Sequence, residues 1–450
     1  MRTWLSIVLA ACGSVKSEAP TDAPPEDAMP AVVTVEATRA DGAPLAETEI
    51  IASAADGSQL ASAVTDGMGR GELPMSAGGM VSIIDRSGPS VEVRTVSDVQ
   101  PGDLLRFRAS NGTPGDTGSM TVRFPASTHP DVTSYEVRTG CDSVDTELTQ
   151  CVVRFSPSCA REAAYLMVTA RAADGRVVAA IDHPGLTYRD GETLQITNAW
   201  YEPVDAQVIW HGLPADADHA SLEMSVSADP PYALFTDWAA SSLLDQPAIL
   251  TLRRPQMRTG GRVNVLKALL SRGDANQWAT QVSDLESTHE MDVTHPLPWI
   301  ESASYDPETR TIRLTRTSGD PAQDAGYASL AYQNDVGVEM MWIGWFDPSR
   351  DSFVLPRLDA AIAVEPHTLH RISGFLIDLD TVDGWGSFRT VIDAENIGLG
   401  SRRGTTRISG LSRSVNTQVD DGSSGLAPFL DGRGSDPMTA TLHVARTLSP

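Results

Sequence analysis

The chain has 450 residues, with 34 Lys and Arg against 59 Asp and Glu, and its formal net charge is −25 at pH 7. A surface this acidic repels nucleic acid and anionic headgroups, so we expect no nucleic-acid partner. Hydrophobic residues make up 41% of the chain. This is enough for several cores, and domains of about 100 to 150 residues would give three or four of them.

Residues 1–11 have the pattern of a bacterial signal peptide. Arg2 supplies a positive charge, and residues 4–11 form a run that is apolar apart from Ser6 and too short for a bilayer span of about 20 residues. The tetrapeptide LAAC at residues 9–12 resembles a bacterial lipobox. The resemblance implies cleavage before Cys12, a diacylglycerol on its thiol, and the membrane as a partner through this anchor. An ordinary secretory signal with a cysteine nearby is the alternative.

Residues 12–30 are rich in Pro, Ala and acidic residues and have little to bury, which predicts a disordered tether. Gly13 and Ser14, rather than an aspartate, follow the cysteine. In the lipoprotein pattern this favours the outer membrane or cell surface over the inner membrane. We therefore expect a lipid-anchored, extracytoplasmic protein.

Residues 31–108 contain short alternating runs separated by turns, including Asp41-Gly42, which predicts an antiparallel β-sandwich. The segments DGAPL and TDGMGRGEL, with Thr65, Asp66 and Gly69 followed by Leu73 and Gly78, resemble the carboxypeptidase regulatory-like or bacterial Ig-like superfamily. The resemblance implies that Asp66 and Gly69 form the turn that returns the chain to the sheet. It implies little about activity, because this module is an appendage in peptidases and a stalk elsewhere.

Residues 119–198 contain six runs of strand length after a linker at 108–118, which predicts a second sandwich. Three cysteines lie there, and we expect a disulfide between Cys141 and Cys159, because Cys151 has the parity of a buried strand face. A bond between Cys141 and Cys151 is the alternative. A zinc site is disfavoured, since no Cys-x-x-Cys and no nearby histidine accompanies the cysteines.

Two similar stretches follow, one near residue 199 with the letters AWYEP and ASLEM, and one near residue 303 with ASYDP and ASLAY. Their spacing of about 100 residues predicts two related β-rich modules, 199–297 and 298–396. The run NVLKALLSR, within 261–282, could form two turns of helix. Residues 397–450 are poor in large apolar residues and are expected to be mostly disordered, except that 438–447 could form an edge strand.

The sequence contains no catalytic motif with the required spacing. His289-Glu290 is followed by His295 six positions after the first histidine, whereas a helical metal pair needs four. His367 and His370 precede an alternating strand and are expected to be ordinary surface residues. Because a nucleophile elbow and a phosphate loop are also missing from the sequence, we expect a protein that is not an enzyme.

Asp378, Asp380 and Asp383 stand before Gly384 and are a candidate calcium site, because a hard cation prefers oxygen ligands. The spacing departs from the calcium loop by one residue and the distal glutamate is missing. A polar hairpin turn at Asp383-Gly384 is the favoured interpretation. No other cofactor is predicted.

Trp342 and Trp345 lie in the segment MMWIGWF and are candidates for ligand binding, because exposed rings can stack on sugars. Burial in a sandwich core is the alternative, and the environment of the two rings decides between them. The sequence as a whole predicts an all-β chain of tandem Ig-like or transthyretin-like sandwiches, acting as a non-catalytic cell-surface lipoprotein and serving as a stalk or interaction module. The alternative is a binding or accessory protein for extracellular polysaccharide or peptide processing, with a surface glycan or a protein as partner.

Overall fold

The computed structural model describes residues 32–39, 42–86, 90–109, 118–156, 160, 164–212, 214–227, 233–241, 248–255, 263–284, 288–294, 296–318, 323–359, 365–391 and 404–415. In these ranges the chain forms 28 strands and one short helix. The prediction of an all-β protein built from tandem sandwiches is confirmed. The helix found in the described ranges is neither long nor apolar enough to cross a bilayer.

The strands form four successive modules of seven strands each. The first module contains β1 (Val32–Thr38), β2 (Glu49–Ser53), β3 (Gln59–Val64), β4 (Arg70–Pro74), β5 (Gly79–Asp85), β6 (Val91–Val99) and β7 (Leu104–Arg108). The second contains β8 (Gly118–Arg123), β9 (Val132–Thr139), β10 (Ser143–Thr146), β11 (Gln150–Phe155), β12 (Ala164–Ala172), β13 (Val177–Leu186) and β14 (Thr193–Gln195).

The third module contains β15 (Val204–His211), β16 (His219–Ser227), β17 (Ala233–Ser241), β18 (Ala248–Arg254), β19 (Val263–Arg272), β20 (Ala275–Asp284) and β21 (Thr288–Asp292). The fourth contains β22 (Ile300–Asp306), β23 (Thr311–Arg316), β24 (Ala325–Gln333), β25 (Glu339–Phe346), β26 (Ser352–Val354), β27 (Thr368–Leu379), helix α1 (Gly384–Val391) and β28 (Gly404–Ser414).

Local sequence accounts for the strands. In β1, Val33, Val35 and Ala37 are buried while the residues between them are partly exposed. This is the period of two that places alternate side chains on one face of a sheet. The connections are short turns, such as the one in which the backbone N–H of Ser58 donates to the Asp56 carboxylate at 2.9 Å. Each module therefore buries one face of each sheet against the other.

The first three modules share one topology. Each pairs a three-stranded sheet (β4-β1-β7, β11-β8-β14 or β18-β15-β21) with four strands in the order β3-β2-β5-β6, β10-β9-β12-β13 or β17-β16-β19-β20. In each of them the first strand pairs in parallel with the last. The fourth module differs in its three-stranded sheet, which has the order β22-β23-β26. Here β22 takes the place that the seventh strand has in the other modules, and it pairs with β23 antiparallel instead of parallel. The similar ASLEM and ASLAY segments lie in the equivalent strands β16 and β24.

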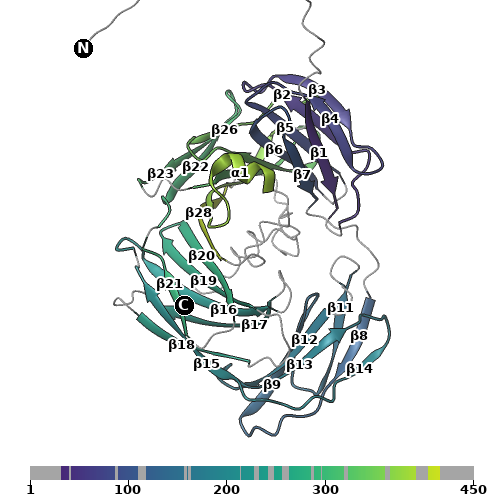
Figure 1. Ribbon diagram of the computed structural model, residues 1–450, viewed down its shortest axis with the longest axis vertical. Coiled ribbons are helices and arrows are strands. Elements are labelled where there is room, and N and C mark those ends of the chain that lie inside the picture. Colours follow the sequence, from purple (N-terminus) through teal and green to yellow (C-terminus); the bar gives the residue numbers. More distant parts are fainter. Residues whose placement is uncertain are drawn as a thin grey trace, which may run out of the picture.

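Three of the four modules share one sheet. The 12-stranded sheet has the order β17-β16-β19-β20-β28-β27-β24-β25-β6-β5-β2-β3. β28 pairs antiparallel with β20 of the third module, and β25 pairs in parallel with β6 of the first module. The last module in the chain therefore lies between the third and the first, and Figure 1 shows the green fourth module returning to the purple first one.

The structure corrects three local predictions. Residues 404–414 were expected in a disordered tail, but they form β28, which pairs on both sides. Small residues suit this strand because a Cβ on Gly410 would lie 2.0 Å from the Phe375 ring. The run NVLKALLSR is strand β19, not a helix, because strands on both sides pair with it. The predicted edge strand at 438–447 lies outside the described residues.

The third correction concerns the turn predicted at Asp383-Gly384. Helix α1 begins at Gly384 and replaces the expected hairpin. Trp385 and Phe388 lie three residues apart, so they share one face of the helix, and both are buried against the shared sheet. Burial of these two aromatic side chains explains why a helix forms here, although the sequence pattern favoured a turn.

Candidate functional site

The described residues contain no group of three or more His, Cys, Asp or Glu side chains that could hold a metal ion. Buried aromatic rings and ion pairs come together where the fourth module meets the first. We call this region the module joint and define it by the β6–β25 pairing, helix α1 and the residues that contact them. The joint is the candidate functional site.

The joint starts from backbone pairing. Residues 340–345 of β25 pair with residues 91–96 of β6 in a parallel register. The fully buried Trp342 of the fourth module donates its Nε1–H to Thr95 Oγ1 of the first module at 3.0 Å, and Thr95 is also hydrogen-bonded to Ser82 at 2.8 Å. The indole N–H is therefore satisfied inside the protein, as buried tryptophans require.

The two candidate ligand-binding tryptophans do not form an exposed platform. Because they are three residues apart on a strand, Trp342 and Trp345 point to opposite faces of the sheet. Trp342 is buried in the core of the fourth module. Trp345 is partly buried, with its ring centroid 4.7 Å from that of Tyr327 and 5.7 Å from that of Phe388. Both rings therefore serve packing, and the motive for a sugar-binding site at this pair is lost.

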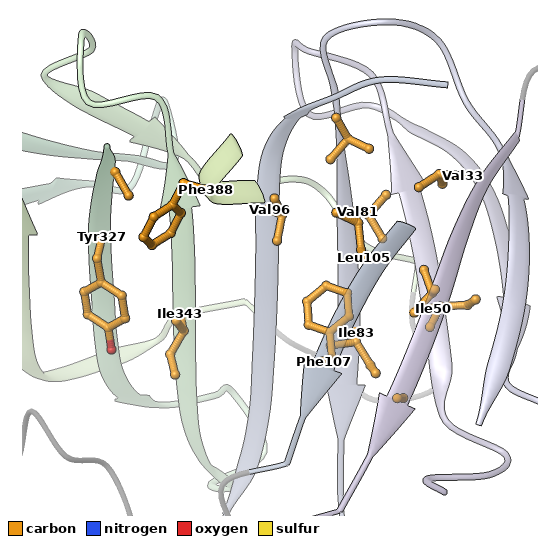
Figure 2. Packing of buried hydrophobic residues seen from close by; sticks show 14 of the residues in the cluster. Val33, Ile50, Val81, Ile83, Val96, Leu105, Phe107, Tyr327, Ile343 and Phe388 are labelled. Atoms are coloured by element: carbon orange, nitrogen blue, oxygen red, sulfur yellow. The ribbon is translucent and has the colours of Figure 1, made fainter. Parts of the chain in front are cut away.

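Trp345 belongs to a row of six aromatic rings that crosses from the third module to helix α1. Successive ring centroids lie 6.3, 5.4, 4.7, 5.7 and 6.0 Å apart. Each such pair contributes about 0.5 to 1.5 kcal/mol beyond its buried area. Figure 2 shows Tyr327, Ile343 and Phe388 on the same side of the sheet as Val96 and the core of the first module. We call this the aromatic row, and it consists of Trp278, Phe375, Tyr327, Trp345, Phe388 and Trp385.

Ion pairs complete the joint. Arg389 of α1 donates to the carboxylate of Asp103 at 2.8 Å and to the backbone carbonyl of Asp98. Arg350 of the fourth module forms an ion pair with the Asp98 carboxylate. Asp98 has a φ of 56°, a left-handed conformation that is costly for a residue with a side chain. The two arginines hold this strained residue, and so tie the first module to the fourth.

The acidic residues of the calcium candidate have separate partners. Asp378 forms an ion pair with Arg407 of β28 at 2.6 Å, and burial raises its pKa although the Arg407 charge opposes this. Asp380 accepts a hydrogen bond from the backbone N–H of Thr405 at 2.8 Å, and Asp383 is exposed. The first two carboxylates therefore join neighbouring segments rather than surrounding a common point.

Asp324 belongs to the module joint through helix α1, and the sequence did not reveal it. Its two carboxylate oxygens accept hydrogen bonds from the backbone N–H groups of Leu379 and Gly384, both at 2.7 Å. Burial raises the pKa of Asp324, and these two hydrogen bonds partly oppose the rise. The residue fixes the start of α1 against the end of β27. No local signal could have identified it, because its partners are 55 and 60 residues away.

The turn predicted in the first module has the expected backbone contacts. The Asp66 carboxylate accepts hydrogen bonds from the N–H groups of Met68 and Arg70 at 2.8 and 2.9 Å. Gly69 has a φ of 74°, and a Cβ there would lie 2.2 Å from the carbonyl oxygen of Ala37. Glycine is therefore required at this position for two independent reasons.

The remaining residues of this motif have structural places. The buried Thr65 hydroxyl donates to the carbonyl of Leu45 at 2.7 Å and accepts from the N–H of Thr48 at 3.0 Å. Gly42 has a φ of 84°, as expected in a tight turn, while Asp41 lies outside the described residues.

The two described cysteines of the second module differ in whether they form a disulfide bond. Cys141 is disulfide-bonded, and Cys151 is a free thiol, so the alternative pairing of these two is excluded. Burial, with a smaller contribution from Asp142, raises the pKa of Cys151 to about 11, which makes this thiol a poor nucleophile at neutral pH. Cys159 and Cys12 lie outside the described residues.

The histidines that were considered as metal ligands do not lie together in the described structure. His289 is buried on β21 and hydrogen-bonded to Ser283 at 3.3 Å, and His295 lies outside the described residues. His367 is exposed, and His370 lies 3.7 Å from the carboxylate of Glu339. These positions give no shared ligand set.

The sequence matches no protein-family model and no curated protein. Among solved structures, the TIE protein of Bacillus anthracis is 9% identical with a TM-score of 0.16, and the match covers 58% of this chain and 50% of that one. The shaft pilin spaA of Lactobacillus rhamnosus GG is 8% identical with a TM-score of 0.16, over 36% of this chain and 95% of that one. A Streptococcal ancillary pilin is 6% identical with a TM-score of 0.14, over 58% and 97%.

The chain thus spans half the length of the TIE protein. At such low TM-scores the superpositions support no functional conclusion.

Proposed function

We propose that this chain is a non-catalytic cell-surface lipoprotein whose β-sandwiches form a rigid structural or interaction module. The observation that carries the proposal is the module joint. Strand β6 pairs with β25, and β20 pairs with β28. These pairings join one sheet from each of three sandwiches into a single continuous sheet. A scaffold that must hold surfaces at a fixed spacing needs such joints, since sandwiches connected by linkers alone would move independently.

The contacts of the joint support a mechanical role. Backbone pairing gives direction and register, the aromatic row removes apolar surface from water, and Arg350 and Arg389 anchor the first module by charge. The chemically distinctive side chains of the fourth module, including both tryptophans of MMWIGWF, are used in packing. The fourth module therefore acts as the element that locks the first and third modules together.

This scaffold role predicts cooperative unfolding. In scanning calorimetry we expect the first, third and fourth modules to unfold in one transition and the second module in another. Replacing Arg389 with alanine removes the ion pair to Asp103, in which the arginine side chain is 11% exposed and the aspartate side chain 17% exposed. The first module should then unfold in a separate, third transition. Replacing Arg176, an exposed residue 3.9 Å from Asp131, is the matched control and should change nothing.

Independent unfolding of all four modules in the unaltered chain would contradict a rigid scaffold. A second contradiction would come from a screen of glycans and peptides against the intact protein. A compound that binds reproducibly and quenches tryptophan fluorescence would favour the alternative function, a binding or accessory protein for extracellular polysaccharide or peptide processing.

The anchor is the second part of the proposal. A diacylglycerol on Cys12 would attach the protein stably, because two acyl chains bind a bilayer where one is marginal at about 0.8 kcal/mol per buried CH₂. Residues 12–30 would hold the modules away from the lipid. The disulfide bond at Cys141, which we assign to Cys159, supports an oxidising, extracytoplasmic location. We place the protein at the outer membrane or cell surface.

The anchor predicts the result of one substitution. Replacing Cys12 with serine removes the thiol that would carry the lipid, so the protein should move from the detergent-dependent membrane fraction to the soluble extracytoplasmic fraction. Fractionation followed by immunoblotting measures this, and Cys151→Ser, which removes a free thiol, is the control that should stay in the membrane fraction. A Cys12→Ser protein that still requires detergent would show that the lipobox interpretation is wrong.

A further inference from the structure

Strand β3 is one end of the 12-stranded sheet and pairs only with β2 among the described strands. None of the backbone hydrogen bonds found between described residues outside regular strands involves residues 60–64. Within the part of the chain that the structure describes, the outer edge of residues 60–64 therefore has no backbone hydrogen-bond partner. Such an edge is a template for an added strand.

The side chains of β3 leave this edge unprotected. Leu60 is 49% exposed and Val64 is 63% exposed, and Met68 in the following turn is 71% exposed. The strand sequence QLASAV contains no charged residue and no proline. Natural edge strands are normally protected from pairing by charges, by proline, by bulges or by being short. In β3 the register shift opposite Ala52 and Ser53 makes Leu60 an extra, bulged residue, so residues 61–64 are the regular part of this edge.

The other edges of the described sheets do carry such protection. Every other end strand of five or more residues in the described sheets contains at least one charged side chain, and these strands are β4, β7, β11, β13, β17, β18, β21 and β22. The remaining end strands, β10, β14 and β26, are three or four residues long. Among these end strands β3 is thus the long one without a charged side chain, and its regular residues 61–64 are suited to pairing with another strand.

Charge at the two ends of β3 restricts the occupant. Asp56 precedes the strand and Asp66 follows it, and both carboxylates are exposed. Hydrogen bonds from Ser58 lower the pKa of Asp56, and hydrogen bonds from the backbone N–H groups of Arg70 and Met68 lower that of Asp66. Both are therefore negative at neutral pH, so a strand added here should be free of acidic residues.

The C-terminal end of the chain meets this requirement. Residues 438–450 contain no Asp or Glu, although the whole chain has 59, and they include His443 and Arg446. The alternating run 438–447 has the pattern of an edge strand. The described chain ends at Val415, and the 22 residues between it and residue 438 could span about 70 Å when extended, which is ample for reaching an edge of the same molecule.

We propose that β3 is a strand-acceptor edge and that residues 438–447 of the same chain are its occupant, adding a strand to the shared sheet. Leu442 and Val444 would extend the apolar surface of Leu60 and Val64. The C-terminal segment would then cover the edge of β3, which has no charged side chain to prevent pairing.

Amide hydrogen exchange on the full chain tests this proposal. We expect slow exchange for residues 60–64, and we expect Leu442→Pro to speed it by about tenfold or more, because proline cannot take part in strand pairing. Leu430→Pro, outside the proposed strand, is the matched control and should leave β3 unchanged. Exchange of the central strand β5 reports whether each variant remains folded.

Two outcomes would overturn the proposal. The first is fast exchange of residues 60–64 in the unaltered chain, or slow exchange that Leu442→Pro does not alter while β5 stays protected. The second is protection that disappears on dilution together with a dimer seen by light scattering, which would assign the edge to a second copy.

Discussion

Replacing Trp342 with alanine is expected to lower the free energy of unfolding by about 3 to 5 kcal/mol, the range for removing a large aromatic side chain from a packed core. Trp342 is fully buried and donates its only polar hydrogen to Thr95 at 3.0 Å across the module joint. The substitution therefore opens a cavity in the fourth module and removes a direct contact with the first. Urea unfolding followed by circular dichroism measures the change.

Two companion variants separate the contributions of packing and of the hydrogen bond. Thr95→Val keeps the shape but leaves the buried indole N–H unsatisfied, which should cost about 1 to 3 kcal/mol. Val336→Ala changes a residue that is 68% exposed, and should change stability by no more than about 0.5 kcal/mol. If Trp342→Ala were as mild as Val336→Ala, the joint would not have the packing described above.

Replacing Glu136 with alanine is expected to destabilise the second module by about 3 kcal/mol, because it leaves two arginines without their partner in a mostly buried site. The Glu136 carboxylate lies 2.6 Å from Arg138, forms an ion pair with Arg171, and accepts a hydrogen bond from Ser143 at 3.0 Å. Its side chain is 8% exposed, so solvent screens the pairs only slightly. Calorimetry on the transition of the second module measures the loss.

The contribution of Glu136 to the stability of the second module should depend on pH. Burial by itself raises the pKa of Glu136, but the charges of Arg138 and Arg171 and the hydrogen bonds outweigh it, so the pKa lies below the ordinary value of 4.5. The unfolded state therefore binds the proton first as pH falls. The contribution of Glu136 is fully present above its unfolded pKa and is lost as pH falls through its folded pKa.

The stability difference between the unaltered chain and Glu136→Gln should accordingly be large at pH 7 and shrink below about pH 4. Asp131→Ala removes a carboxylate that is 57% exposed and 3.9 Å from Arg176, and it is the control expected to show little effect at either pH. A Glu136→Gln difference that stayed constant from pH 7 to pH 3 would contradict the assigned ion pairs.

Local features of the fold could be predicted because they depend on neighbouring residues. The alternation of Val33, Val35 and Ala37 fixes which face of β1 is buried, and the period of two holds for any strand. The turn at Asp66 and Gly69 was implied by the resemblance of this segment to a known superfamily, and its hydrogen bonds and backbone angle involve residues only a few positions apart. The conclusion that the chain is all-β followed from such signals.

The candidate site could not be predicted in the same way. Trp342 and Trp345 were recognised as unusual, but a strand pattern cannot state which element will cover each face. Trp345 is covered by Phe388 of a helix that the sequence did not predict. Arg389 and Asp103 are 286 residues apart, and no spacing rule connects them.

By itself, the sequence determined that the chain is all-β and built from tandem sandwiches, because propensity, alternation and short motifs act over a few residues; the anchor at Cys12 stays a prediction. Only the tertiary structure decided that β28 is a strand, that α1 replaces a turn, and that the fourth module joins the third to the first in one sheet. The physical reason is that pairing between strand edges uses backbone groups that every residue carries. Which edges meet depends on the shapes and charges of folded modules, and these exist only after each module has formed.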